Sequence, residues 1–180
     1  MSQAIGCGIS RCTLYDLLDQ GIVERVSRGI YRMTELPPIS NPDLAIVGLR
    51  FPKAVICTVS ALAYHEITTQ IPRSVHVAVL RESRQPHLEY PPLRAHRFSG
   101  VAFHSGIEEH QIGGASVRIY SLEKTLADCF KLRNKIGIDV ALEAIRLYKA
   151  RKHTDISAIM SYAKICRVEN VMHPYLEAIF

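Results

Sequence analysis

Leucines in the first part of the chain recur with the period of one helix face. Leu14, Leu17 and Leu18 follow the i, i+3, i+4 spacing, so the pattern predicts a short amphipathic helix over residues 10–20. Ser10 is a natural N-cap, because its hydroxyl can accept a hydrogen bond from a free backbone N–H of the first turn. We therefore expect the helix to begin directly after Ser10.

The residues on either side of this helix predict how it starts and how it ends. Ile9 and Leu14 have the spacing of a hydrophobic staple. Gly21 is the residue type that most readily takes the left-handed conformation at a helix end. Residues 23–32 then form two short runs around a Ser-Arg-Gly turn, which indicates a tight hairpin. Because only nine residues precede Ser10, we expect a shortened winged helix-turn-helix that lacks its first helix.

The chain divides at a proline-containing segment. Residues 36–41 hold two prolines and break both periodicities, so we expect a linker there. This gives a partial winged-helix unit over residues 1–35 and a larger domain over residues 42–180. At the start of that domain Asn41 and Pro42 have the N-cap and N1 positions of a helix that runs to about Arg50.

Beyond this helix the pattern changes from mixed strands and helices to helices alone. The predicted class is therefore α+β: a partial winged helix-turn-helix, then a mixed α/β domain that ends in a helical bundle. The expected strands are 54–57, 74–80, 95–98, 101–105, 107–112 and 115–120, and the expected helices are 58–66, one capped by Ser121, 138–150, one beginning near Asp155, and 169 to the end.

Charge and cysteine content set the broad class of protein. The chain carries 22 basic and 17 acidic residues, a mild excess that favours acidic partners such as nucleic acid. Its five widely spaced cysteines are typical of a reducing compartment. Nothing resembles a signal peptide, and the apolar runs are far below the roughly 20 residues that cross a bilayer. We expect a cytoplasmic protein with no membrane partner.

A helix followed at once by a basic hairpin is typical of a recognition helix and its wing. The first turns of the helix would enter a major groove, and the wing arginines would contact phosphates. The alternative is a protein-contact module, and Asp16 and Asp19 on the outer helix face would repel a phosphate backbone. The candidate DNA-binding residues are Ser10, Arg11, Thr13, Tyr15, Arg25, Arg28 and Arg32.

A second basic cluster lies near the end of the predicted helix 138–150. It can be a solvated face, with cations favoured at a helix C-terminus, or an electrostatic surface for an acidic partner. Its members are Arg146, Lys149, Arg151 and Lys152, with Lys131, Arg133 and Lys135 close by in the sequence.

No pattern of catalytic or metal-binding residues emerges. Five histidines lie between positions 76 and 110, but none has the spacing of a zinc site. Neither a nucleophile elbow nor a glycine-rich phosphate loop occurs, and Glu108 and Glu109 would point to opposite faces of a strand. We therefore expect no enzyme activity, no metal and no cofactor.

Four ordered segments resemble the AbiE-type abortive-infection antitoxins of type IV toxin–antitoxin systems. The resemblance implies a winged helix that binds inverted repeats in its own promoter, a C-terminal domain needed for antitoxicity, and a nucleotidyltransferase-like toxin countered without a stable complex. It assigns DNA contact to the seven candidates named above and no chemistry to the last two segments. The four segments are 10–15 with 21–31, 58–65 through 71–75, 121–128, and 137–144.

Three hypotheses follow, in descending order. The first is an antitoxin that also regulates its own operon by binding DNA. The second is an interaction or antitoxin module with a degenerate winged helix and no DNA role. The third is a nuclease-like enzyme, which would require a metal-binding acidic cluster.

Overall fold

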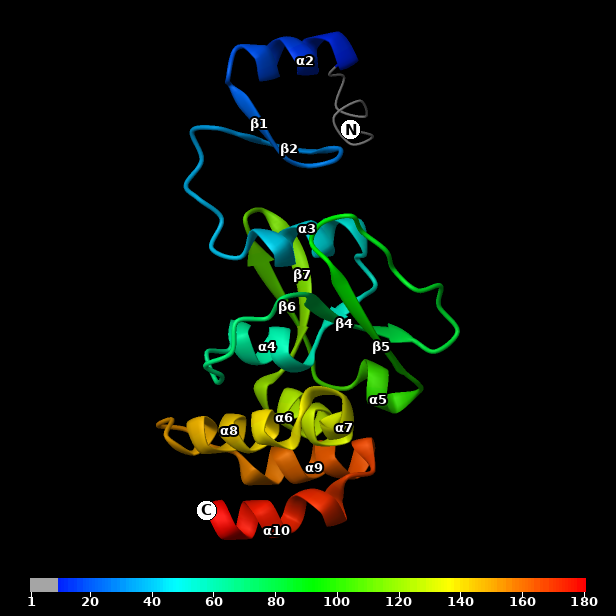
Figure 1. The fold of residues 1–180 in the computed structure, drawn as a ribbon, viewed down its shortest axis with the longest axis vertical. Helices are drawn as coiled ribbons and strands as arrows, with labels where there is room; N and C mark the ends of the chain where they lie inside the picture. The colour runs from blue at the N-terminus through cyan, green and yellow to red at the C-terminus, as the bar shows by residue number, and fades with distance from the viewer. Residues whose placement is uncertain (1–9) are drawn as a thin grey trace.

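Three layers follow one another along the long axis of the molecule (Figure 1). The computed structural model describes residues 10–180. The N-terminal unit lies at one end, a mixed sheet with its helices occupies the middle, and a stack of C-terminal helices forms the other end. The predicted α+β class, with a partial winged helix before a mixed domain and a helical bundle, is confirmed.

The N-terminal unit consists of helix α2 (Arg11–Asp19) and the hairpin of β1 (Val23–Ser27) and β2 (Ile30–Met33). Ser10 caps α2 as predicted, since its side chain accepts a hydrogen bond from the backbone N–H of Thr13. Gly21 and Gly29 have φ angles of +70° and +75°, which L side chains rarely adopt, and they end the helix and turn the hairpin. The predicted staple involves Ile9, which lies outside the described residues.

The central sheet has the order β5-β4-β3-β7-β6 and mixes parallel with antiparallel pairs. Neighbours β4 and β5 are parallel, as are β3 and β7, whereas β3 with β4 and β6 with β7 are antiparallel. The strands are β3 (Val55–Ile56), β4 (Val75–Leu80), β5 (Leu93–Phe98), β6 (Ile107–Ile112) and β7 (Ala115–Tyr120).

Both faces of the sheet are covered. Helix α3 (Pro42–Arg50) packs on β7, where Val47 and Val117 belong to one apolar cluster. Residues that alternate with that cluster, such as Val55 and Phe98, point to the opposite face and join a second one. Helix α4 (Thr58–Tyr64) connects the sheet to the C-terminal helices through its contacts with β4 and α6. The short β3 is thus buried in the centre of the fold.

The expected strand over residues 101–105 is wrong. These residues form the single turn α5 (Val101–His104), which the Ser105 hydroxyl closes by donating to the Val101 carbonyl at 2.8 Å. Val101 is 68% exposed while Ala102 and Phe103 are buried. Five residues are too few to separate the period of a strand from that of a helical turn, so the sequence pattern was ambiguous.

The C-terminal helices stack beneath the sheet around one apolar core. The four long predicted helices are confirmed; Ser121 acts as an N-cap as expected, and Asp155, near which a helix was expected to begin, caps it. Among the described residues, no helix combines the length and apolar character needed to span a bilayer. The helices are α6 (Leu122–Lys131), the additional short α7 (Arg133–Ile136), α8 (Ile138–Lys149), α9 (Ile156–Cys166) and α10 (Glu169–Ile179).

A fully buried ion pair joins two turns of α6 where the helix meets the sheet. Lys124 Nζ donates to both carboxylate oxygens of Asp128 at 2.6 Å, and neither side chain is exposed. The ammonium also lies 4.2 Å from the ring centroid of Tyr120. The Cys166 thiol donates to Asp128 at 3.3 Å, which ties α9 to the pair. Burial raises the pKa of the Asp128 carboxyl, and the Lys124 ammonium opposes that rise.

Candidate nucleic-acid interface

The first turn of α2 presents two hydroxyl groups at its exposed end. The Ser10 and Thr13 hydroxyls lie 2.8 Å apart, and Ser10 Oγ accepts the Thr13 N–H at 3.1 Å. The capping interaction therefore occupies part of the hydrogen-bonding capacity of both candidates. Arg11 opens the helix, and its side chain lies outside the described part of the structure.

Three of the predicted DNA-contact residues come together on one cleft. Tyr15 of α2 and Arg25 and Arg28 of the hairpin line a hollow of about 940 Å³ between the N-terminal unit and the central domain. Tyr31 of β2 lines the same hollow. The Tyr15 side chain is 55% exposed, and both arginines are exposed. Aromatic faces beside guanidinium groups suit contact with bases and phosphates.

The central domain contributes one cation to this cleft that the sequence did not single out. Arg50, the last residue of α3, faces the hairpin, and its Nη2 atom lies 3.6 Å from where a Cβ on Gly29 would be. His87 and Tyr90 line the same side, and Glu89 is the single carboxylate among the described lining residues. No local pattern marked Arg50, because its role depends on how the linker returns the chain to the sheet.

Arg32 has a different environment from the other two wing arginines. Its Nε lies 3.0 Å from a Glu24 carboxylate oxygen, and its Nη2 donates to the carbonyls of Leu36 and Pro37, the latter at 3.0 Å. Only 14% of its side chain is exposed. The guanidinium therefore ties the hairpin to the start of the linker, which positions the wing.

The outer face of α2 is acidic, as the sequence predicted. Asp16 and Asp19 are both exposed, whereas Leu14 is 5% exposed and points inward. A phosphate backbone lying along the side of this helix would meet two negative charges. Only the N-terminal end of α2 is compatible with close approach to nucleic acid.

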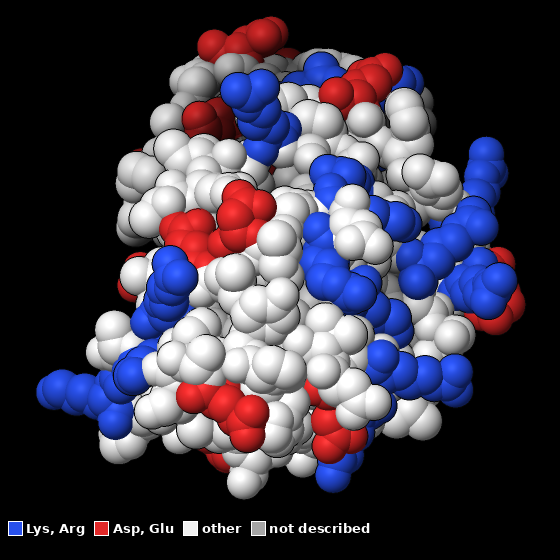
Figure 2. Space-filling model, turned by 60° about the horizontal axis from the view of Figure 1, so that its bottom comes forward, with Lys and Arg blue, Asp and Glu red and all other residues white. Residues whose placement is uncertain are grey.

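Other basic side chains gather on the centre and right of the face shown in Figure 2. At the junction of β5 with α6 and α7, Arg94 Nη2 donates to the Lys135 carbonyl at 3.0 Å, and Lys131 lies 5.3 Å from the Phe98 ring centroid. The basic residues that end α8 are engaged locally, because Lys149 donates to the Ile179 carbonyl and Arg151 to that of His65. The end of α8 is thus a stabilised helix terminus as well as a charged surface.

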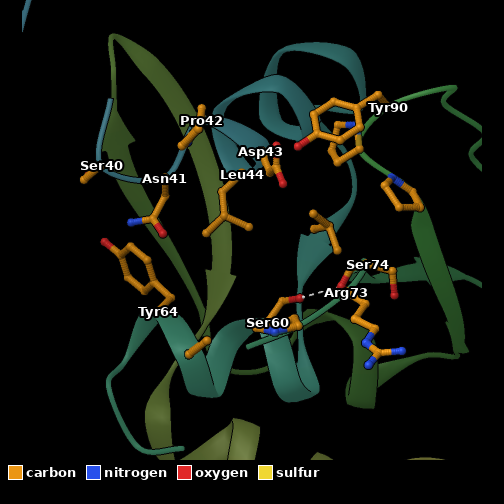
Figure 3. A pocket seen from close by; sticks show the side chains of 15 residues that line it. Ser40, Asn41, Pro42, Asp43, Leu44, Ser60, Tyr64, Arg73, Ser74 and Tyr90 are labelled. Atoms are coloured by element: carbon orange, nitrogen blue, oxygen red, sulfur yellow. Dashed lines mark hydrogen bonds between the residues drawn. The ribbon is translucent and has the colours of Figure 1, made fainter. Parts of the chain in front are cut away.

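A smaller hollow of about 250 Å³ lies at the start of α3 (Figure 3). Asp43 and Tyr90 face it from one side and Tyr64 from α4, while the Ser60 hydroxyl donates to the Ser74 carbonyl at 3.4 Å. Burial raises the pKa of the Asp43 carboxyl, and the Tyr90 hydroxyl beside it works in the opposite direction. The Ser60 bond links α4 to the chain entering β4, so this part of the hollow has a structural role.

A buried polar cluster in the sheet was not predicted from the sequence. Thr58 Oγ1 lies 2.8 Å from His76 Nδ1, and His96 Nε2 lies 3.3 Å from the same nitrogen. Burial is the main cause that lowers the pKa of each histidine to about 4, so both are neutral at pH 7. All three residues are at most 6% exposed. They are 18 and 20 residues apart along the chain, and the pairing of β4 with β3 on one side and with β5 on the other brings them together.

These histidines do not extend to a metal centre. Within residues 10–180 the structure holds no group of three or more histidine, cysteine or carboxylate side chains that could bind an ion. The cluster's partners are protein atoms, and it joins the start of α4 to two strands. The cluster is therefore a buried hydrogen-bond network in which the polar side chains bind one another in the core of the fold.

The described N-terminal unit, a helix followed at once by a basic hairpin, has the arrangement expected of a recognition helix and its wing. Residues 1–34 match the family model described as a transcriptional regulator, AbiEi antitoxin. This match confirms, over the helix and the hairpin, the resemblance inferred from the sequence, and it supports an antitoxin and regulatory role. The description names a regulator and not an enzyme. None of the curated proteins compared with the chain matches it.

Proposed function

We propose that the chain is the antitoxin of a type IV toxin–antitoxin operon and represses that operon by binding its promoter DNA. The observation that carries the proposal is the convergence of Tyr15, Arg25 and Arg28 on one cleft. Among the described residues, neither arginine forms an ion pair with a carboxylate, so both are available to phosphates. The functional units are the predicted ones: residues 1–35 for DNA contact, 36–41 as linker and 42–180 for antitoxicity.

The N-terminal end of α2 enters the major groove of an inverted repeat, where Ser10, Arg11 and Thr13 face the base edges. Arg25 and Arg28 of the wing contact the flanking phosphates. Each phosphate contact releases counterions, so affinity falls as salt concentration rises. Arg32 acts on DNA contact indirectly, by positioning the wing, because Glu24 and the linker carbonyls hold its guanidinium. The acidic side of α2 faces away from the duplex.

The test measures fluorescence anisotropy of a labelled duplex from the chain's own upstream region, with a scrambled duplex of equal length beside it. We expect Arg28→Ala to weaken binding by about tenfold and to reduce the slope of log affinity against log salt by about one. The matched control is Arg146→Ala, which also removes one exposed arginine charge, but from α8 at the opposite end of the molecule. The control is expected to leave both quantities close to those of the unchanged protein.

Two results would contradict the proposal. One is equal affinity for the upstream and scrambled duplexes at every salt concentration. The other is an equal loss of affinity for Arg28→Ala and Arg146→Ala, which would reduce the wing's role to net charge alone.

The exposed pair Asp16 and Asp19 favours a second candidate, an antitoxin that acts without DNA. In this case the partner is a nucleotidyltransferase-like toxin or its target, and the wing has no part in rescue. Co-expression of that toxin with full-length Arg25→Ala/Arg28→Ala separates the two functions. Rescue that persists in this variant while repression is lost assigns antitoxicity to the larger domain, and loss of rescue assigns it to the wing.

A further inference from the structure

A second cleft in the central domain combines an apolar floor with a cationic rim. Its volume is about 450 Å³, within the range of small-molecule sites. The floor is made by Phe51 after α3, by Val79 and Leu80 at the end of β4, and by Phe103 of α5. Phe103 and Val79 are 3% and 7% exposed, so these elements of the fold hold the floor in place.

Four cations from three segments surround this floor: Arg50 and Lys53 at and after the end of α3, Arg84 in the loop after β4, and Arg118 of β7. No aspartate or glutamate belongs to the described lining. Glu109 lies opposite Arg118 in the β6–β7 register, yet no ion pair within 4 Å joins them. The Arg118 contact that the structure does show is donation to the Lys53 carbonyl at 3.3 Å.

This arrangement differs from an ordinary solvated surface, where charges of both signs alternate. Cations gathered around an apolar hollow repel one another, and the hollow itself prefers an apolar occupant to water. A ligand that carries a negative group on an apolar body satisfies both requirements. A simple anion leaves the floor exposed, and an uncharged hydrophobic molecule leaves the repulsion in place.

We propose that this cleft is a binding site for a small anionic amphiphile, a carboxylate or phosphate carried on an aromatic or aliphatic body. The body lies on Phe51, Leu80 and Phe103, and the anionic group contacts Arg84 and Arg118. The proposal goes beyond DNA binding, since it requires no nucleic acid. It gives the central domain a ligand site of its own.

The experiment titrates the full chain by isothermal calorimetry with three probes: naphthalene-2-carboxylate, naphthalene-2-methanol and inorganic phosphate. The first two share a ring and differ in charge, and the third has charge without a ring. We expect the carboxylate to bind at least tenfold more tightly than either of the others. Equal binding of the alcohol, equal binding of phosphate, or no binding of the carboxylate at millimolar concentration would each overturn the proposal.

Two charge-reversal variants locate the site. Arg84 lines the cleft, whereas Arg81 is exposed in the same loop and does not line it. Arg84→Glu is expected to weaken naphthalene-2-carboxylate by at least tenfold, because it places a repulsive charge beside the ligand. Arg81→Glu, which changes net charge equally, is expected to alter affinity less than twofold. Equal effects of the two variants would show that the carboxylate binds through net charge and that the cleft is not its site.

Discussion

The N-terminal unit and the C-terminal helices are stabilised in opposite ways. Among the side chains that the structure describes in residues 10–35, Arg11 not being one of them, Leu14 alone has less than 9% exposure, and caps and glycine turns fix the remaining geometry. The C-terminal helices instead share a large apolar core that encloses an ion pair. Surfaces that contact partners are drawn from lightly packed parts of a protein, and the wing fits that rule.

We expect a fully buried ion pair and a partly exposed one to respond differently to mutation. Lys124→Met leaves the Asp128 carboxylate buried without its partner and is expected to lower the free energy of unfolding by about 3–5 kcal/mol. Arg32→Ala removes the partner of Glu24, which is 52% exposed, together with two hydrogen bonds to linker carbonyls, and is expected to cost about 1–2 kcal/mol within the N-terminal unit. Urea unfolding followed by circular dichroism measures the first effect, and hydrogen exchange in the β1–β2 hairpin measures the second.

The double variant Lys124→Met/Asp128→Leu is the control for this contrast. An apolar pair of similar size removes both buried charges and is expected to recover most of the lost stability. If Lys124→Met alone cost no more than Arg32→Ala, burial would not be what separates the two regions.

A second prediction concerns pH and the histidine pair of the central sheet. Burial lowers the pKa of His76 and His96 to about 4 from an ordinary value of 6.5. As pH falls below 6.5 the unfolded chain takes up protons before the folded chain does. The stability contributed by the neutral pair is therefore present above pH 6.5 and is lost as pH falls toward 4.

We expect the free energy of unfolding to fall by about 4 kcal/mol from this pair between pH 7 and pH 5, about 2 kcal/mol from each histidine. Chemical unfolding at both pH values, for the unchanged protein and for His96→Gln, isolates the contribution. The variant keeps a donor toward His76 and removes one titrating group, so its pH dependence is expected to be shallower. His87→Gln, which changes an exposed histidine, is the matched control. Identical pH dependence in all three proteins would contradict the assignment.

The same division explains which features the sequence could predict. Ser10, Gly21 and Gly29 act within a few residues of themselves, so the helix and the hairpin follow from local chemistry. The β5-β4-β3-β7-β6 order depends on pairing between distant segments, and no local pattern encodes it. For the candidate site, Tyr15, Arg25 and Arg28 could be named in advance, because they belong to the local unit.

Features that depend on tertiary contacts were beyond sequence analysis. Arg50 joins the cleft only because α3 returns toward the hairpin. The Arg32 guanidinium binds carbonyls of the linker, so it is not free to contact phosphates as the other wing arginines are. The short turn α5 lacks the length that would separate it from a strand. The Thr58–His76–His96 cluster requires the pairing of β4 with both β3 and β5.

The smallest expected effect compares two serine N-caps, one in each region. Ser121 is buried and accepts the Lys124 N–H at 3.3 Å, so Ser121→Ala leaves a buried donor unpaired and is expected to cost about 2 kcal/mol in global unfolding.

Ser10 is exposed, and water can replace its hydroxyl at the Thr13 N–H. Ser10→Ala is therefore expected to cost about 0.5 kcal/mol. Because α2 lies outside the large cores, that loss should appear as fraying of α2 in hydrogen exchange and leave the urea midpoint unchanged. A midpoint shift as large as that of Ser121→Ala would mean that α2 unfolds together with the central domain and that the two regions are one cooperative unit.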